Sequence, residues 1–163
     1  MNKETINYSI FRAYDIRGNY PAEINEAAAY AIGKGYCHVF HPADVAVGMD
    51  VRRSSPPLKN ALIKGLLDAG ADVIDLDKVT TDMVYFAVGA YGYAGGIIVS
   101  ASHNPPQYNG LKMVREKATA ISSDTGLFEI RDALKSGKVV DEPGRQKGKL
   151  LKKEITADYV KHV

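Results

Sequence analysis

The stretch Gly95-Gly-Ile-Ile-Val-Ser-Ala-Ser-His-Asn-Pro-Pro-Gln-Tyr-Asn-Gly-Leu-Lys-Met-Val114 decides how the rest of the chain is interpreted. An apolar run at 96–99 ends in small and polar residues, two prolines and an Asn-Gly pair, and a second apolar run begins at Leu111. This pattern predicts a buried strand, a shaped loop and a second strand. Because proline fixes its own φ and restricts the residue before it, the polar residues 102–104 are presented in few conformations.

The loop brings four chemically different groups within reach of one another. They are the hydroxyl of Ser102, the imidazole of His103, the amide of Asn104 and the ammonium of Lys112. Residues 108–110 are predicted to turn the chain back, with glycine at position 110 accepting a positive φ, so that Lys112 returns toward the loop. From the residues alone, a single structural hydrogen bond for His103 and full solvation for Lys112 remain alternatives.

Helical and strand patterns alternate along the chain. Helices are predicted at 24–39 with Asn25 as cap, from a Ser55 cap with Pro56 in the first turn, from an Asp82 cap to Tyr91, and at about 126–134 before Gly137. Strands are predicted at 45–49, 71–76, 96–100 and 111–114. The alternation indicates the α/β class, with a small, mostly parallel sheet between helices and one antiparallel strand at the end.

Ligands of such sheets bind beyond the carboxyl ends of the strands. The residues that follow two of these ends include Arg52, Arg53 and Ser102, which are therefore expected on one rim. Near the N-terminus, Arg17 offers a guanidinium fork that suits phosphate oxygens, and Tyr14 could add a hydroxyl donor. A plain salt bridge from Arg17 to Asp15 is the alternative.

Composition bounds the class of protein. The 163 residues are 45% hydrophobic and 25% charged, which fits one ordinary soluble domain. Neither a membrane span nor a signal-peptide core is visible, so a cytoplasmic protein is expected. Because Cys37 is the single cysteine, an internal disulfide and a thiolate metal cluster are excluded. Cys37 is expected to lie buried in a helix. Gly33 and Gly35 in the same helix suggest close packing against the sheet.

Positive charge gathers in one stretch only. Arg145 to Lys153 contains five basic and no acidic residues. Its glycines, its lack of helical periodicity and its lack of interleaved aromatics favour a solvated connector over a nucleic-acid site. Neither a nucleotide-binding glycine loop nor a Gly-x-Ser-x-Gly elbow occurs, so nucleotide binding and a hydrolase triad have no support from motifs.

Four segments carry a family resemblance. Ala101–Pro105 together with Tyr108–Lys112 resembles the phosphoserine loop of the α-D-phosphohexomutases, the family of phosphomannomutase and phosphoglucomutase. Phe11–Gly18, Gly48–Ser55 and Ile121–Leu127 resemble other segments of that family and occur in the family's order. The resemblance implies a three-layer α/β/α domain I over residues 1–150 with a mixed four-stranded sheet and a phosphoserine loop at 100–105. Residues 151–163 are then a basic connector leading toward a second domain.

The resemblance also implies roles for the candidate site residues. Ser102 would carry a transferable phosphate and, through it, one ligand position for Mg²⁺, whose aspartates lie in a second domain. His103 and Asn104 would orient the phosphoserine, Arg17 and Lys112 would bind phosphate and assist proton transfer, and Tyr14 would contact substrate. In the unphosphorylated domain, Arg17 and Lys112 are expected to face water with no anion between them.

The implied reaction interconverts hexose 1-phosphate and 6-phosphate through a bisphosphorylated sugar, with mannose favoured over glucose. A first domain alone lacks the metal aspartates and the sugar-binding and phosphate-binding loops of domains II to IV, so it is expected to be inactive by itself. Its partners would be a phosphorylated hexose and those domains, with no nucleic acid and no membrane. The alternative is a stand-alone α/β module that binds phosphorylated ligands or a protein partner.

Overall fold

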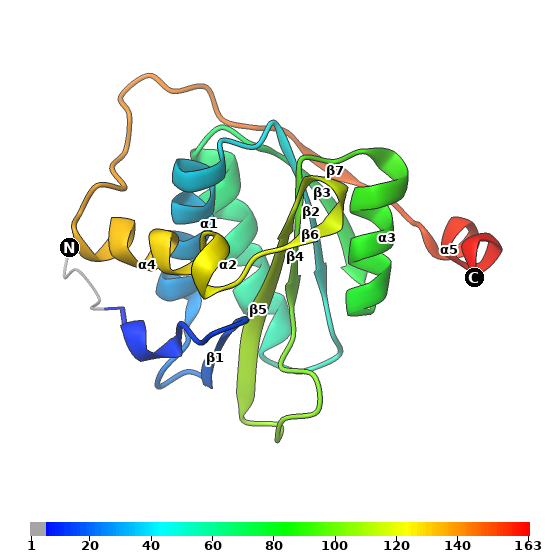
Figure 1. Cartoon of the computed structure of the whole chain (residues 1–163), viewed down its shortest axis with the longest axis horizontal. Helices are drawn as coiled ribbons and strands as arrows, with labels where there is room; N and C mark the ends of the chain where they lie inside the picture. Colours follow the sequence, from blue (N-terminus) through cyan, green and yellow to red (C-terminus); the bar gives the residue numbers. More distant parts are fainter. Residues whose placement is uncertain (1–5) are drawn as a thin grey trace.

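The computed structural model describes residues 6–163 and shows one mixed sheet with helices on both faces (Figure 1). Its seven strands follow the order β1-β5-β4-β2-β3-β7, with β6 paired to β5. Their bounds are β1 (Ile16–Asn19), β2 (Asp44–Met49), β3 (Asp72–Lys78), β4 (Gly95–Val99), β5 (Tyr108–Arg115), β6 (Thr119–Ala120) and β7 (Leu150–Lys152). The predicted class is confirmed, although the described residues form seven strands rather than four.

Two strand positions differ from the prediction. Strand β5 does not lie at the edge of the sheet, because it pairs antiparallel with both β4 and β1. The basic stretch 145–153 was expected to be a solvated connector, yet Leu150–Lys152 adds to β3 as a parallel edge strand. The remaining neighbours, β2 with β3 and β2 with β4, are parallel as expected.

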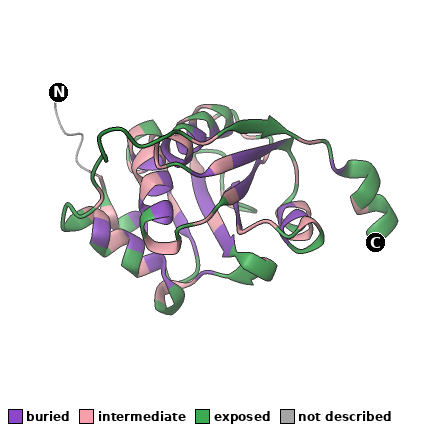
Figure 2. Cartoon of the chain, turned by 90° about the horizontal axis from the view of Figure 1, so that it is seen from above, coloured by how far each residue is buried: buried purple, intermediate pink, exposed green. Residues whose placement is uncertain are grey.

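The helices form the two outer layers. They are α1 (Glu26–Phe40), α2 (Ser55–Asp68), α3 (Thr81–Tyr91), α4 (Leu127–Lys135) and α5 (Thr156–His162), with short 3-10 turns at η1 (Tyr8–Ile10), η2 (Glu116–Ala118) and η3 (Ser123–Thr125). Helices α1, α2 and α4 cover one face of the sheet and α3 covers the other, while α5 projects beyond it (Figure 1). Burial follows these layers, and α5 stays largely exposed (Figure 2).

The predicted caps meet with mixed outcomes. The Asn25 side chain accepts a hydrogen bond from the backbone N–H of Ala28, which confirms it as the cap of α1. The predicted Asp82 cap is wrong, because Thr80 caps α3. At the end of α4, Gly137 takes φ +72° and closes the helix as expected.

The predicted Ser55 cap is wrong for a reason that matters to the site. Helix α2 already begins at Ser55, with Ser54 as its N-cap residue and proline following in the first turn. The hydroxyl of Ser55 donates instead to Asp50 Oδ1 over 2.5 Å. Ser55 is therefore a buried contact of the loop that follows β2.

The glycines of α1 permit close contact with other helices rather than with the sheet. A Cβ on Gly33 would lie 2.7 Å from the carbonyl oxygen of Leu62 in α2, and one on Gly35 would lie 2.9 Å from Ile130 Cγ2 in α4. The contact with α2 is reciprocal, because a Cβ on Gly65 would overlap the carbonyl oxygen of Tyr30. The predicted packing of Gly33 and Gly35 against the sheet is thus wrong.

The single cysteine lies where it was expected. Cys37 is buried within α1, and its burial raises the pKa of its thiol to about 12. Among residues 6–163, none of the helices has the length and apolar character needed to span a bilayer.

Candidate functional site

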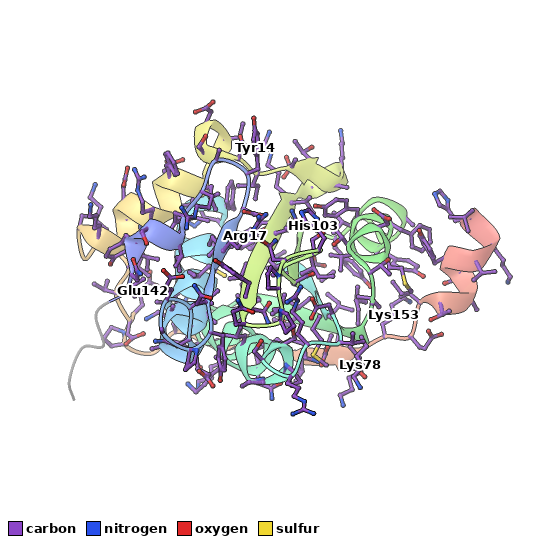
Figure 3. All side chains as sticks on the ribbon, turned by 90° about the horizontal axis from the view of Figure 1, so that it is seen from below. Tyr14, Arg17, Lys78, His103, Glu142 and Lys153 are labelled. Atoms are coloured by element: carbon purple, nitrogen blue, oxygen red, sulfur yellow. The ribbon has the colours of Figure 1, made fainter. Side chains whose placement is uncertain are left out.

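The carboxyl ends of β2, β3 and β4 border one cleft. It has a volume of about 650 Å³ and is walled mainly by apolar side chains, including Met49, Val79 and Ile98. Ser102 and Arg52 line the same cleft, so the expected common rim is confirmed for these two residues, whereas Arg53 lines a neighbouring hollow instead. The loops after β2 and β4 lie together at the lower end of the sheet in Figure 1, and Figure 3 looks onto that end.

The turn that leads back into β5 falls earlier than predicted. Residues 108–110 belong to β5, and Gly110 does not take a positive φ. The chain reverses instead within residues 101–107, where Ser102 itself adopts φ +54°. Glycine at position 110 is needed for another reason, since a Cβ there would overlap the carbonyl oxygen of Ile16 on the adjacent β1.

Ser102 holds an uncommon backbone conformation in an exposed position. For a residue with a Cβ, the left-handed region costs roughly 1–2 kcal/mol, and such strain persists only where surrounding contacts enforce it. Its backbone N–H donates to Ser100 Oγ over 3.0 Å. Its hydroxyl lies 3.4 Å from Nδ1 of the exposed His103. The hydroxyl is thus open to solvent, with an imidazole next to it.

Asn104 acts within the loop. Its Nδ2 donates to the carbonyl of Ala101 over 2.6 Å, and its backbone N–H donates to the same carbonyl over 3.0 Å. The side chain of Tyr14, in contrast, is 79% exposed and points away from the packed core (Figure 3). The structure therefore places Asn104 in the serine loop and leaves Tyr14 free at the surface.

Arg17 and Lys112 come together, but with an anion between them. Arg17 Nη2 lies 2.6 Å from Asp15 Oδ2, and Lys112 Nζ lies 3.2 Å from the same oxygen. The expectation of two cations facing water without an anion is wrong, and the alternative salt bridge from Arg17 to Asp15 is present. Since β1 and β5 are neighbours and Asp15 is buried, the carboxylate fixes both cations on one face of the sheet.

One buried donor of Arg17, its Nε, has no hydrogen-bond partner in the described part of the chain. Leaving a buried donor without a partner costs about 1–3 kcal/mol. Arg17 thus retains hydrogen-bonding capacity that its contact with Asp15 does not use.

Metal ligands do not cluster in the described part of the chain. Within residues 6–163, no group of three His, Cys, Asp or Glu side chains gathers closely enough to hold an ion. The described residues therefore offer no ready-made magnesium site by themselves.

Comparison with known proteins agrees with this geometry. Residues 8–141 match the family model described as phosphoglucomutase/phosphomannomutase, alpha/beta/alpha domain I. The chain belongs to this family. In this chain, the matched residues 8–141 carry the serine loop, the cation pair and the cleft.

Relatives with a known name support the assignment. A phosphomannomutase of Escherichia coli is 44% identical over 153 residues, covering 94% of this chain and 34% of that protein. A phosphomannomutase of Klebsiella pneumoniae is 44% identical over 150 residues, covering 92% of this chain and 96% of that protein. The chain thus spans about a third of the first relative and nearly all of the second.

Solved structures agree with the fold. The crystal structure of a phosphoglucomutase/phosphomannomutase family protein from Burkholderia thailandensis superimposes with a TM-score of 0.84 at 32% identity, covering 96% of this chain and 35% of that one. The phosphohexomutase fold is therefore present throughout this domain.

Sequence reasoning missed two residues of the site. Asp15 was considered only as a partner of Arg17, although its carboxylate also holds Lys112. Arg52 was placed on the rim without a role, yet its guanidinium contacts the serine loop directly. No sequence signal marks the second residue, because its partners are backbone carbonyls.

Proposed function

We propose that this chain is the catalytic-serine domain of a phosphohexomutase. In the proposed reaction, phosphoserine 102 transfers its phosphoryl group to the free hydroxyl of a hexose monophosphate, giving a hexose bisphosphate and an unmodified serine. The serine oxygen then takes the other phosphoryl group from the sugar, which releases the isomeric monophosphate. This proposal rests on one observation. The backbone of Ser102 takes φ +54°, and its exposed hydroxyl lies on the rim of the cleft.

The surrounding groups suit phosphoryl transfer. This chemistry depends on positioning and on neutralising the charge of the transferred group more than on covalent help. Arg17 and Lys112 supply two cations, and Arg17, whose side chain is 32% exposed, uses only one of its N–H donors on Asp15. His103, 3.4 Å from the hydroxyl, can move a proton to or from the serine oxygen.

Magnesium would add positive charge next to the transferred phosphate. Since the described residues form no metal site, we assign this domain one ligand only, a phosphate oxygen on Ser102. The remaining ligands are proposed to come from other domains of the enzyme. For the sugar we propose mannose over glucose, because the Escherichia coli and Klebsiella pneumoniae relatives are named phosphomannomutases.

Alone, the 163-residue chain is expected to have no mutase activity, because the proposed metal ligands and sugar-binding loops lie outside it. A coupled assay with mannose 1-phosphate and excess Mg²⁺ measures this. Turnover at ordinary enzymatic rates would contradict the domain assignment. The stand-alone alternative, a module that binds phosphorylated ligands or a protein partner, also predicts no turnover, and the Klebsiella pneumoniae relative of nearly equal length is compatible with it.

The location of the phosphate tests the proposal directly. Purified full-length mutase that contains this domain is expected to carry a single phosphate, and fragmentation mass spectrometry should locate it on Ser102. Treatment with hexose 6-phosphate in excess should remove it as bisphosphate is released. A phosphate on another serine, such as Ser100 or Ser122, would refute the assignment of Ser102.

A further inference from the structure

The loop that carries Ser102 is wrapped around the side chain of Arg52. Arg52 Nη2 donates to the carbonyls of Ser102 over 2.9 Å and Asn104 over 2.7 Å. Its Nη1 donates to the carbonyls of Pro105 over 2.8 Å and Tyr108 over 3.1 Å. Three carbonyl oxygens of the serine loop and one at the start of β5 thus converge on one guanidinium.

The fifth donor of Arg52 fixes the guanidinium itself. Its Nε donates to Asp50 Oδ2 over 3.1 Å, while Asp50 Oδ1 accepts from the backbone N–H of Arg52 and from the hydroxyl of Ser55. A guanidinium has five N–H donors, so every one of them is used. The side chain is only 13% exposed, and its stem is therefore held by the protein as well.

A second contact joins the same loops. Buried Asn109, which follows the serine loop, donates from Nδ2 to the hydroxyls of Ser54 and Ser55. The β2–α2 connection and the serine loop are thus joined at two points, by Arg52 and by Asn109. The hydrogen bonds of Arg52 are charge-assisted, and one of them reaches Ser102 itself.

We propose that Arg52 is the positioning residue for Ser102. By drawing the carbonyls of residues 102, 104, 105 and 108 inward, it holds Ser102 in the left-handed conformation that presents its hydroxyl at the cleft. Because all five of its donors are occupied by Asp50 and the loop, Arg52 has none left for substrate. It acts on catalysis through the position of the serine, and this part of the inference rests on the proposed function.

The structural half of the inference is tested on the chain itself by ¹⁵N NMR. In Arg52→Ala, amide resonances of residues 101–108 are expected to shift and to lose hydrogen-exchange protection, while those of α1 and β2 stay in place. Adding guanidinium at millimolar concentration should restore the loop resonances, because it supplies planar N–H donors to the vacated site. Methylammonium has the same charge without that geometry and should not restore them.

Two further variants sharpen this test. Arg53→Ala is the matched control, since Arg53 is adjacent to Arg52, exposed and equally charged, but its side chain forms no hydrogen bond or ion pair with another described residue. The loop resonances of this variant should match those of the wild type. Arg52→Lys keeps the charge but offers three donors for five acceptors, and it carries the test if Arg52→Ala does not fold. Unshifted loop resonances in both Arg52 variants, an equal effect of Arg53→Ala, or equal rescue by methylammonium would overturn the proposal.

The catalytic half is measured in the full-length mutase. A misplacement of about 1 Å can cost on the order of 10²-fold in rate, so kcat of Arg52→Ala is expected to fall by about that factor with KM within about twofold, and guanidinium should recover part of it. A raised KM with unchanged kcat would show a substrate-binding residue instead. Failure of the proposed function and failure of the positioning role of Arg52 are distinguishable. An active Ser102→Ala enzyme would refute the proposed function, but the NMR evidence that Arg52 holds the serine loop would remain valid. An inactive Ser102→Ala with a fully active Arg52→Ala would refute this inference alone.

Discussion

In the full-length mutase, Ser102→Ala is expected to lower kcat/KM by on the order of 10³-fold or more, as removal of a covalent catalytic group does in other enzymes. The alanine has no oxygen to carry the phosphoryl group, so no alternative route through this loop remains. The serine side chain is exposed, and its one hydrogen-bonding contact among the described residues is with His103. The fold should therefore be unaffected by its loss. Steady-state kinetics with mannose 1-phosphate provide the measurement.

The control is a serine outside the cleft. Ser136 is exposed at the end of α4, and Ser136→Ala should retain wild-type activity. Thermal unfolding curves of both variants are expected to superimpose on that of the wild type. Activity within tenfold of wild type in Ser102→Ala would exclude a phosphoserine mechanism at this position.

A large effect on stability is expected where α1 crosses α2. Gly65→Ala should destabilise the chain by about 2–4 kcal/mol, since overpacking typically costs 1–3 kcal/mol and more where backbone must move. The added methyl would overlap the backbone carbonyl of Tyr30, which cannot rotate aside as a side chain can. Urea unfolding followed by circular dichroism measures the free energy of unfolding.

The same glycine-to-alanine substitution in α3 is expected to raise the free energy of unfolding rather than lower it. Gly89 is exposed within α3, and a Cβ there would meet no atom within 4 Å. Gly89→Ala should therefore stabilise by up to about 1 kcal/mol through helix propensity alone. Equal effects of Gly65→Ala and Gly89→Ala would show that close contact between α1 and α2 does not control stability.

Much of the fold follows from local patterns, and the exceptions have physical causes. Strands β2 to β5 and helices α1 to α4 were predicted because their apolar periodicity reflects burial on one or both faces. Strand β7 could not be predicted, because its three residues are exposed on the edge of the sheet and therefore lack an apolar pattern. Its pairing with β3 depends on a contact across a long sequence separation, which local composition does not record.

The site was predictable in its residues but less so in its geometry. The Asn-Gly pair at 109–110 suggested a turn, yet both residues lie in β5, and close approach of β1 accounts for the glycine. The positive φ lies instead at Ser102, although serine rarely takes that conformation. The four carbonyls bound by Arg52 have no side-chain identity, so no residue pattern could have indicated them.

The order of the strands determines which groups would stabilise the proposed phosphate on Ser102. In many α/β proteins, the loop after a parallel strand enters a helix whose N-terminal N–H groups and dipole stabilise a bound phosphate. Here β4 is followed by β5, so no helix begins where the serine loop ends. Under the proposed mechanism, side chains such as Arg17 on β1 and Lys112 on β5 would supply that stabilisation in place of a fixed backbone dipole. Unlike a dipole, these cations have a protein anion, Asp15, as their partner when no phosphate is bound.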